Sequence, residues 1–220
     1  MIILSNELDA QEWKNLFNGK NLQGWTVLNG TAEYSIEDGA IVGTTKPGTP
    51  NTFLATDEHY DDFILEAEVW VDPSVNSGIQ FRSNSLADYQ DHRVHGYQFE
   101  LDPSERKWTG GIYDEARRGW LYPLTENPKA QNAFQNGTWN KIRIEAIGQH
   151  LNTWVNGIHC SRLVDDMTDK GFIALQVHSI QDESQANKQI KWKNIRIITS
   201  MPEKHRSVVS APMKNVMTTK

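Results

Sequence analysis

Residues 63–71 read Phe-Ile-Leu-Glu-Ala-Glu-Val-Trp-Val, a segment in which apolar residues recur at every second position. Such a period of two places all of these side chains on one face of an extended strand. An amphipathic helix would instead bring apolar residues together at intervals of three and four. The alternation therefore predicts a β-strand with one buried face, formed by Phe63, Leu65, Ala67, Val69 and Val71.

The same alternation continues on both sides of this segment. It recurs in Gly78–Arg82, Tyr97–Asp102, Trp139–Ala146, Phe172–His178 and Ile190–Ile198. Asp38-Gly39 and Asn156-Gly157 are tight-turn signals between strand-like segments. Only Asn6–Leu16 has weak helical spacing. Because strands do not alternate with helices, we expect an all-β fold, a jelly-roll sandwich of two antiparallel sheets.

The sandwich is expected to span residues 16–199, after an N-terminal segment over 1–15. Residues 200–220 contain two prolines and few large apolar residues, which favours an extended or poorly ordered C-terminal tail. Ser83–His95 and Tyr113–Gln135 lack strand alternation. We interpret both as long loops, which in compact domains are often functional.

Composition excludes several classes of protein. The chain has 220 residues, a formal net charge of −6, eight Trp and a single cysteine, Cys160. No apolar run approaches the roughly 18 residues of a membrane span. An acidic chain without a basic stripe argues against nucleic-acid binding. One cysteine excludes an internal disulfide. The N-terminus lacks the basic start and long apolar stretch of a signal peptide, so we expect either export after signal removal or a cytoplasmic protein.

Three of the predicted strands carry an unusual polar face. Their alternation places on it Gln80, Arg82, Gln98, Glu100, Asp102, Gln176 and His178. Glutamine amides both donate and accept hydrogen bonds, which suits a hydroxyl-rich ligand. If the strands are neighbours, these residues form the floor of a cleft. The alternative is a solvent-facing sheet with one cross-strand ion pair.

The segment Trp108–Trp120 joins aromatic and basic residues in one stretch. It contains Trp108, Tyr113, Arg117, Arg118 and Trp120. Aromatic faces stack on sugar rings, and arginines donate paired hydrogen bonds to hydroxyls or oxyanions. These residues are candidates for substrate binding. The alternative is a loop packed over the sandwich edge, with its arginines paired to the nearby Asp114 and Glu115.

An ordered series of segments resembles the 3-keto-disaccharide hydrolase domain family. They are residues 16–25, 34–43, 63–69, 76–82, 96–102, 137–140, 154–157, 171–178 and 193–196. The resemblance covers roughly residues 16–198 and implies a concanavalin A-like sandwich. It also implies cleavage of glycosides whose sugar is oxidised at C3, and proteins that are largely bacterial and often periplasmic. The family's Ser-Gly-Ile-x-Phe-Arg and Leu-Gln-x-His motifs fall on Ser77–Arg82 and Leu175–His178.

This resemblance suggests a mechanism. A 3-keto group acidifies the proton at C2, so a base can remove it while the C1 substituent departs. We expect Glu100 or His178 to act as base or acid, and Arg82 to stabilise the enolate or orient Glu100. Gln80, Gln98, Gln176 and Asp102 are expected to contact the substrate.

Three alternatives remain open at this point. A divalent metal held by Glu100 and His178 would polarise the keto oxygen. Glu100 and Asp102 would form the carboxylate pair of an ordinary glycosidase. A carbohydrate-binding module or lectin would use the same fold and aromatic residues without chemistry.

Overall fold

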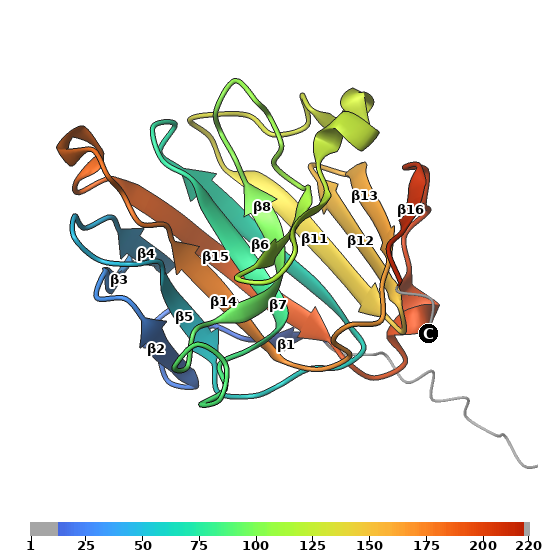
Figure 1. The fold of residues 1–220 in the computed structure, drawn as a ribbon, viewed down its shortest axis with the longest axis horizontal. Coiled ribbons are helices and arrows are strands. Elements are labelled where there is room, and N and C mark those ends of the chain that lie inside the picture. The colour runs from blue at the N-terminus through green and yellow to red at the C-terminus, as the bar shows by residue number, and fades with distance from the viewer. Residues whose placement is uncertain (1–12, 218–220) are drawn as a thin grey trace, which may run out of the picture.

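The computed structural model describes residues 13–217 and consists of two β-sheets packed face to face (Figure 1). The strands are β1 Lys14–Asn15, β2 Trp25–Asn29, β3 Glu33–Glu37, β4 Ala40–Thr44, β5 Thr52–Thr56, β6 Phe63–Val71, β7 Ser77–Asn84, β8 His95–Leu101, β9 Ile112–Glu115, β10 Gly119–Tyr122, β11 Asn140–Ile147, β12 His150–Val155, β13 Ile158–Val164, β14 Phe172–Val177, β15 Gln189–Ile198 and β16 Met213–Asn215. Four 3-10 turns complete it: η1 Leu124–Glu126, η2 Pro128–Ala130, η3 Glu183–Gln185 and η4 Pro202–His205.

The strand order confirms the predicted sandwich. Within residues 13–217, sheet A has nine strands in the order β16-β13-β12-β11-β6-β15-β4-β3, with β1 also paired to β15. Sheet B has seven described strands in the order β10-β9-β8-β7-β14-β5-β2. Every strand pair is antiparallel except β13 with β16, which run parallel.

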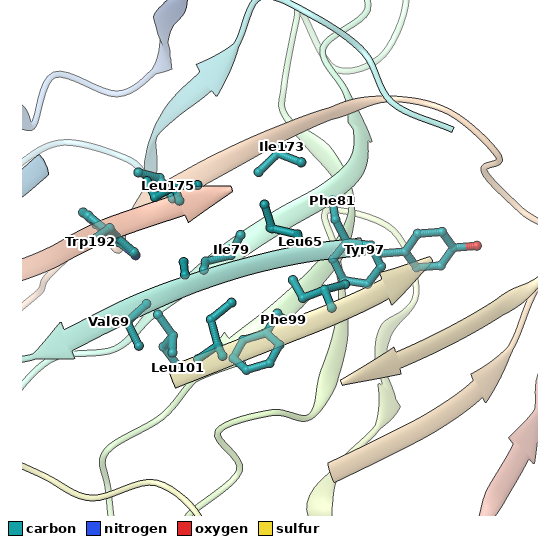
Figure 2. Packing of buried hydrophobic residues seen from close by; sticks show 14 of the residues in the cluster. Leu65, Val69, Ile79, Phe81, Tyr97, Phe99, Leu101, Ile173, Leu175 and Trp192 are labelled. Atoms are coloured by element: carbon teal, nitrogen blue, oxygen red, sulfur yellow. The ribbon is translucent and has the colours of Figure 1, made fainter. Parts of the chain in front are cut away.

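The hydrophobic core lies between the two sheets, as the alternation predicts. Figure 2 shows Leu65 and Val69 of β6 facing Ile79 and Phe81 of β7 and their neighbours on β8 and β14. These side chains are almost completely buried. Since one face of each strand is used in this way, the opposite face of sheet B is free to carry polar groups.

Two of the predicted turns join adjacent strands. Asn156-Gly157 links β12 to β13, and Asp38-Gly39 links β3 to β4. The interpretation of Tyr113–Gln135 as one long loop is wrong, because it contains strand residues of β9 and all of β10, which pair as a hairpin at the edge of sheet B. These strands are only four residues long, too short for alternation to be visible.

The C-terminal segment also differs from the expected tail. Residues 200–217 pack on the sandwich, with β16 beside β13 at the edge of sheet A (Figure 1). His159 on β13 accepts two backbone hydrogen bonds from this segment, from Ser210 at 2.7 Å and Ala211 at 2.8 Å. At the other end, the helical spacing predicted for Asn6–Leu16 is wrong for its described part, because Lys14–Asn15 form the short strand β1; residues 6–12 of that segment lie outside the described residues.

The single cysteine is buried in β13 under the segment that joins β8 to β9. A Cβ atom added to Gly110 of that segment would lie only 2.8 Å from the Cys160 Sγ. The Gly110 carbonyl accepts hydrogen bonds from Thr153 and Ser161 of sheet A. The β8–β9 segment is thus fixed against sheet A at this point. Among the described residues, no helix has the length and apolarity that a membrane crossing requires.

Candidate functional site

The polar faces of three predicted strands merge into one surface on sheet B. Strands β14, β7 and β8 are neighbours, so Gln176, Gln80, Gln98 and Glu100 share its outer face. The amide of Gln80 donates to Gln98 Oε1 at 2.6 Å, and the amide of Gln98 donates to Glu100 Oε2 at 2.9 Å. A continuous row of hydrogen bonds therefore leads across the sheet to one carboxylate.

This outer face is strongly concave. Asn51, just before β5, donates to Glu115 Oε1 of β9 at 3.4 Å, although β14, β7 and β8 lie between these strands. In a flat sheet, four strand spacings would separate them by roughly 19 Å. The hollow has a volume of about 350 Å³. Its lining includes Glu100, Gln98, Asn76, Arg106, Tyr113, Trp120, Glu115 and His178.

Glu100 lies on the floor of this cavity and is 4% exposed. Asn76 donates to its Oε1 at 2.7 Å, and the Arg106 guanidinium lies 3.6 Å from the same oxygen. Burial raises the pKa of Glu100 from its ordinary value near 4.5 to about 7, although the Asn76 and Gln98 amides oppose this shift. A carboxylate with such a pKa exchanges protons readily near neutral pH.

Gly78 and Gln176 lie beside the hydrogen-bonded pair Gln98–Glu100 on the outer face of sheet B. Gly78 of β7 is paired with Glu100 of β8, and a Cβ atom there would lie 2.4 Å from the Gln98 side chain. Gly78 thus leaves the space in which Gln98 reaches Glu100. Beside it, Gln176 is buried, and neither its Oε1 nor its Nε2 has a hydrogen-bond partner within residues 13–217. Like Gln80, Gln176 is completely buried and does not line the cavity, so the expectation that these two side chains contact the substrate is wrong. A buried water would satisfy the Gln176 amide.

Two arginines, Arg93 and Arg106, line the cavity, and Arg106, from the turn after β8, is the one beside Glu100. Its Nε donates to Asp102 at 2.7 Å, and its guanidinium lies over the rings of Trp108 at 4.6 Å and Trp120 at 5.1 Å. Asp102 does not line the cavity with Glu100. Burial opposes ionisation of Asp102, but hydrogen bonds from Ser104 and Arg106 outweigh it and lower its pKa. Asp102 therefore orients Arg106.

The aromatic wall consists of Trp120 and Tyr113. Their rings meet edge to face with centroids 5.2 Å apart, and both line the cavity. Trp108 lies behind this wall, partly buried against the core, with its ring 4.7 Å from that of Trp120. The structure thus places Trp120 and Tyr113 at the cavity, whereas Trp108 supports Trp120 and Arg106.

His178 lines the same cavity, just beyond the end of β14. Its Nδ1 lies 2.6 Å from the backbone carbonyl of Ser179. A carbonyl only accepts hydrogen bonds, so Nδ1 carries the proton and Nε2 is the acceptor of the neutral ring. His178 and Glu100 therefore converge on one cavity, as the alternation predicts.

The expectation that Arg82 shares this face is wrong. Arg82 has a positive φ of 46° at a β-bulge, which turns its side chain away from Glu100. It is buried and donates to the carbonyls of Asp61 and Gly148 and to the carboxylate of Asp62. Ser83 takes the outward position and donates to Gln80 Oε1 at 2.8 Å. Arg82 therefore stabilises the end of the sandwich.

Arg117 and Arg118 do not line the cavity either. Their Nε atoms donate to the buried carboxylate of Asp114 at 2.7 and 2.6 Å. Arg118 also binds Asp165, on the loop after β13. Asp114 faces the opposite side of β9 from Tyr113 and Glu115, so these arginines hold the β9–β10 hairpin against the sandwich.

The structure adds Asn76, Arg106 and Glu115 to the cavity, none of which the sequence marked as a site residue. Recognition of Ile112–Glu115 as a strand would have placed Tyr113 and Glu115 on one face by their spacing of two. Arg106 lies in an irregular turn, and no periodic signal could have placed it. Asn76 lies just before β7, where strand alternation had not yet begun.

A larger hollow of about 730 Å³ lies on the outer face of sheet A. Its two arginines are already paired with one carboxylate: Arg143 lies 2.6 Å from Glu66, and Arg196 lies 2.6 Å from the other Glu66 oxygen. Both arginines are thus held by Glu66, whereas the cavity around Glu100 brings together a buried carboxylate, a histidine and two aromatic rings. The cavity around Glu100 is therefore the better candidate site.

The cavity does not fit a resident divalent metal held by Glu100 and His178. Both oxygens of Glu100 already accept amide hydrogen bonds, and the adjacent Arg106 guanidinium repels a cation. Within residues 13–217, no group of three or more His, Cys, Asp or Glu side chains is arranged to hold a metal ion.

The fold and cavity define a lectin-like β-sandwich with a polar, aromatic-walled hollow on one sheet. The chain belongs to the 3-keto-alpha-glucoside-1,2-lyase-like domain family, whose model matches residues 12–198. This is a carbohydrate-active class of domain, which confirms the family suggested by the ordered segments.

Solved structures agree on the fold. A Parabacteroides distasonis protein assigned as a glycosyl hydrolase is 18% identical, with a TM-score of 0.63 and coverage of 90% of this chain and 98% of that one. A Bacillus subtilis protein with a galectin-like fold is 8% identical, with a TM-score of 0.60 and coverage of 86% and 98%. The B. subtilis carbohydrate-binding module CBM66 is 17% identical, with a TM-score of 0.52 and coverage of 81% and 97%. No curated protein matches the chain in sequence.

Proposed function

We propose that this domain cleaves 3-keto-glucosides by base-assisted elimination at C1. The observation that carries the proposal is Glu100, a buried carboxylate on the floor of a polar cavity, with a pKa near 7. Membership of the 3-keto-alpha-glucoside-1,2-lyase-like family supports the substrate class. The carbohydrate-binding fold of the neighbours is consistent with a sugar ligand.

The reaction begins at C2 of the oxidised sugar. Ionised Glu100 removes the C2 proton, which the adjacent C3 ketone makes acidic, and the C–H electron pair forms an enolate. The Arg106 guanidinium, held by Asp102 and the tryptophan rings, stabilises the negative enolate oxygen. It thus takes the role that the sequence assigned to Arg82.

The second half of the reaction breaks the C1–O bond. The enolate electrons form a C1=C2 double bond, and the leaving oxygen departs with the bonding pair and receives a proton. Addition of water across the double bond would give the hydrolysis product. His178 Nε2 and the Gln98 amide are positioned in the cavity to bind sugar hydroxyls.

The test compares aglycone release from a 3-keto-α-glucoside and from the matching unoxidised glucoside. We expect turnover of the keto-sugar alone, with a rate that rises with pH through about 7 as Glu100 ionises. Glu100→Gln should lower the rate by about 10²–10⁴-fold. Glu105→Gln, an exposed substitution with the same charge change, is the matched control and should leave the rate unchanged.

Other outcomes identify the alternatives. Cleavage of the unoxidised glucoside would favour a two-carboxylate glycosidase. Binding of the keto-sugar without turnover would favour a lectin or carbohydrate-binding module. Full activity of Glu100→Gln would exclude Glu100 as the base. Export to the periplasm stays a prediction from the resemblance.

A further inference from the structure

The cavity around Glu100 continues into a second compartment of about 440 Å³. The two compartments share four lining residues, namely Asn51, Arg93, Glu115 and Ser179. Beyond these, the second compartment is lined by Asn29, Pro50, Phe53, Gln90, Asp91 and Val94. Each volume is sufficient for one sugar ring, and the shared residues mark the junction.

Glu115 is the carboxylate at this junction. Its Oε1 accepts the 3.4 Å hydrogen bond from Asn51 and lies 4.0 Å from the Arg93 guanidinium. Its other oxygen, Oε2, has no hydrogen-bond partner in the described part of the chain, so it can face a ligand. In contrast, both oxygens of Glu100 are occupied by protein donors.

Resting on the function proposed above, we infer that Glu115 donates the proton to the leaving oxygen and that the leaving group occupies the second compartment. With the oxidised ring beside Glu100, its C1 substituent must cross the junction to reach that compartment. The glycosidic oxygen then passes Glu115. Glu100 gains the C2 proton, and Glu115 loses its own proton to the departing oxygen. After the reaction Glu100 is protonated and Glu115 is ionised, and proton exchange with solvent restores the starting protonation of both carboxyls.

The surroundings of Glu115 suit a proton donor. Glu115 is 7% exposed, and this burial raises its pKa, although Arg93 and His178 act in the opposite direction. The neutral carboxylic acid is therefore stabilised relative to an exposed glutamate. Tyr113 lies two residues from Glu115 on the same face of β9. Burial raises the pKa of Tyr113, and the nearby charges of Glu115 and Glu100 raise it further.

The decisive experiment uses two 3-keto-α-glucosides that differ in leaving group. A 4-nitrophenolate leaves without protonation, whereas methoxide needs a proton donor. We expect Glu115→Gln to lower kcat/KM for the methyl glucoside by about 100-fold or more, and for the nitrophenyl glucoside by less than about 5-fold. The basic limb of the methyl-glucoside pH profile should disappear. Glu105→Gln serves again as the exposed control.

The outcomes separate this inference from the proposed function. If the wild-type protein cleaves neither substrate, the proposed function fails and the inference fails with it. If the wild type is active but Glu115→Gln loses both activities equally, or loses neither, Glu115 is not the proton donor. Thermal unfolding of the variant checks that the sandwich is intact.

The position of the leaving group is tested separately at Pro50, an exposed residue that lines only the second compartment of the two. Pro50→Trp fills that compartment without removing a backbone N–H donor. We expect KM for a 3-keto-disaccharide to rise at least about tenfold while KM for the methyl 3-keto-glucoside changes little. An equal change for both substrates would contradict the assigned position.

Discussion

Two requirements oppose each other at Glu100. The residue must be buried in the cavity to act on a substrate there, and it must be ionised near neutral pH to act as a base, although burial disfavours the ionised form. Burial raises its pKa to about 7, while Asn76 and Gln98 keep the charged form accessible. Functional carboxylates commonly carry a cost of this kind in stability.

This cost predicts a pH-dependent stability. Between pH 4.5 and about 7 the folded protein binds more protons at Glu100 than the unfolded chain, so stability falls as pH rises. Glu100→Gln removes this loss. The change in the free energy of unfolding caused by the substitution should therefore be more favourable at pH 8 than at pH 4, by up to about 3 kcal/mol. Urea denaturation at both pH values measures the effect. An equal stability difference at both pH values would contradict the raised pKa.

Gly78 provides a second prediction at this scale. Gly78→Ala places a methyl group where the Gln98 side chain now lies, which forces Gln98 away from Glu100. The fold should persist because a flexible side chain can move, but activity should fall by about tenfold or more as the row of hydrogen bonds is lost. Near-wild-type activity with a displaced Gln98 would show that the row is dispensable. Initial rates and thermal unfolding distinguish the two effects.

At the scale of elements, the β9–β10 hairpin carries one wall of the cavity and depends on a buried ion cluster. Asp114 is fully buried and accepts from Arg117 and Arg118. Asp114→Asn removes the buried negative charge that pairs with both guanidiniums, and should destabilise the protein by about 3 kcal/mol or more. Glu58→Gln breaks the exposed pair with Lys14 and should cost less than about 1 kcal/mol. Similar costs for both would contradict the role of the cluster.

The regularity of each strand decided how much of the fold and the site could be predicted from the sequence. Strands β6, β7, β8 and β14 alternate over six or more residues, so their faces and their residues Gln80, Gln98, Glu100 and Gln176 were predictable. Arg82 was misplaced because a single bulge reverses the parity of a strand. Arg106 could not be found, since its position depends on a turn and on contacts with Asp102, Trp108 and Trp120.

On the scale of the whole molecule, the C-terminal segment closes the outer edge of sheet A through β16 and His159. Both backbone donors of this segment point to Nδ1 of the ring, which can accept only when it carries no proton. Burial lowers the pKa of His159 from 6.5 to about 4, in agreement with this geometry.

Acid should therefore loosen this segment. The folded state favours the neutral ring, so its contribution to stability is complete above pH 6.5 and is lost as pH falls toward 4. We expect hydrogen exchange of residues 206–217 to accelerate at pH 4.5 relative to pH 7.5, after correction for the intrinsic rate. His159→Gln should abolish this dependence, whereas the exposed His150→Gln should not. Equal protection at both pH values would refute the attachment through Nδ1.

Because the single thiol is buried, its rate of chemical modification measures how often the surrounding structure opens locally. Cys160 is buried against Gly110 of the β8–β9 segment, and burial raises its thiol pKa to about 12. We therefore expect it to react with a labelling reagent when this segment lifts from sheet A. That same segment carries Arg106, so a ligand held by Arg106 should keep the segment closed. We expect a saturating keto-sugar to slow thiol modification severalfold. An unchanged rate would show that opening at Cys160 is independent of ligand binding at the cavity.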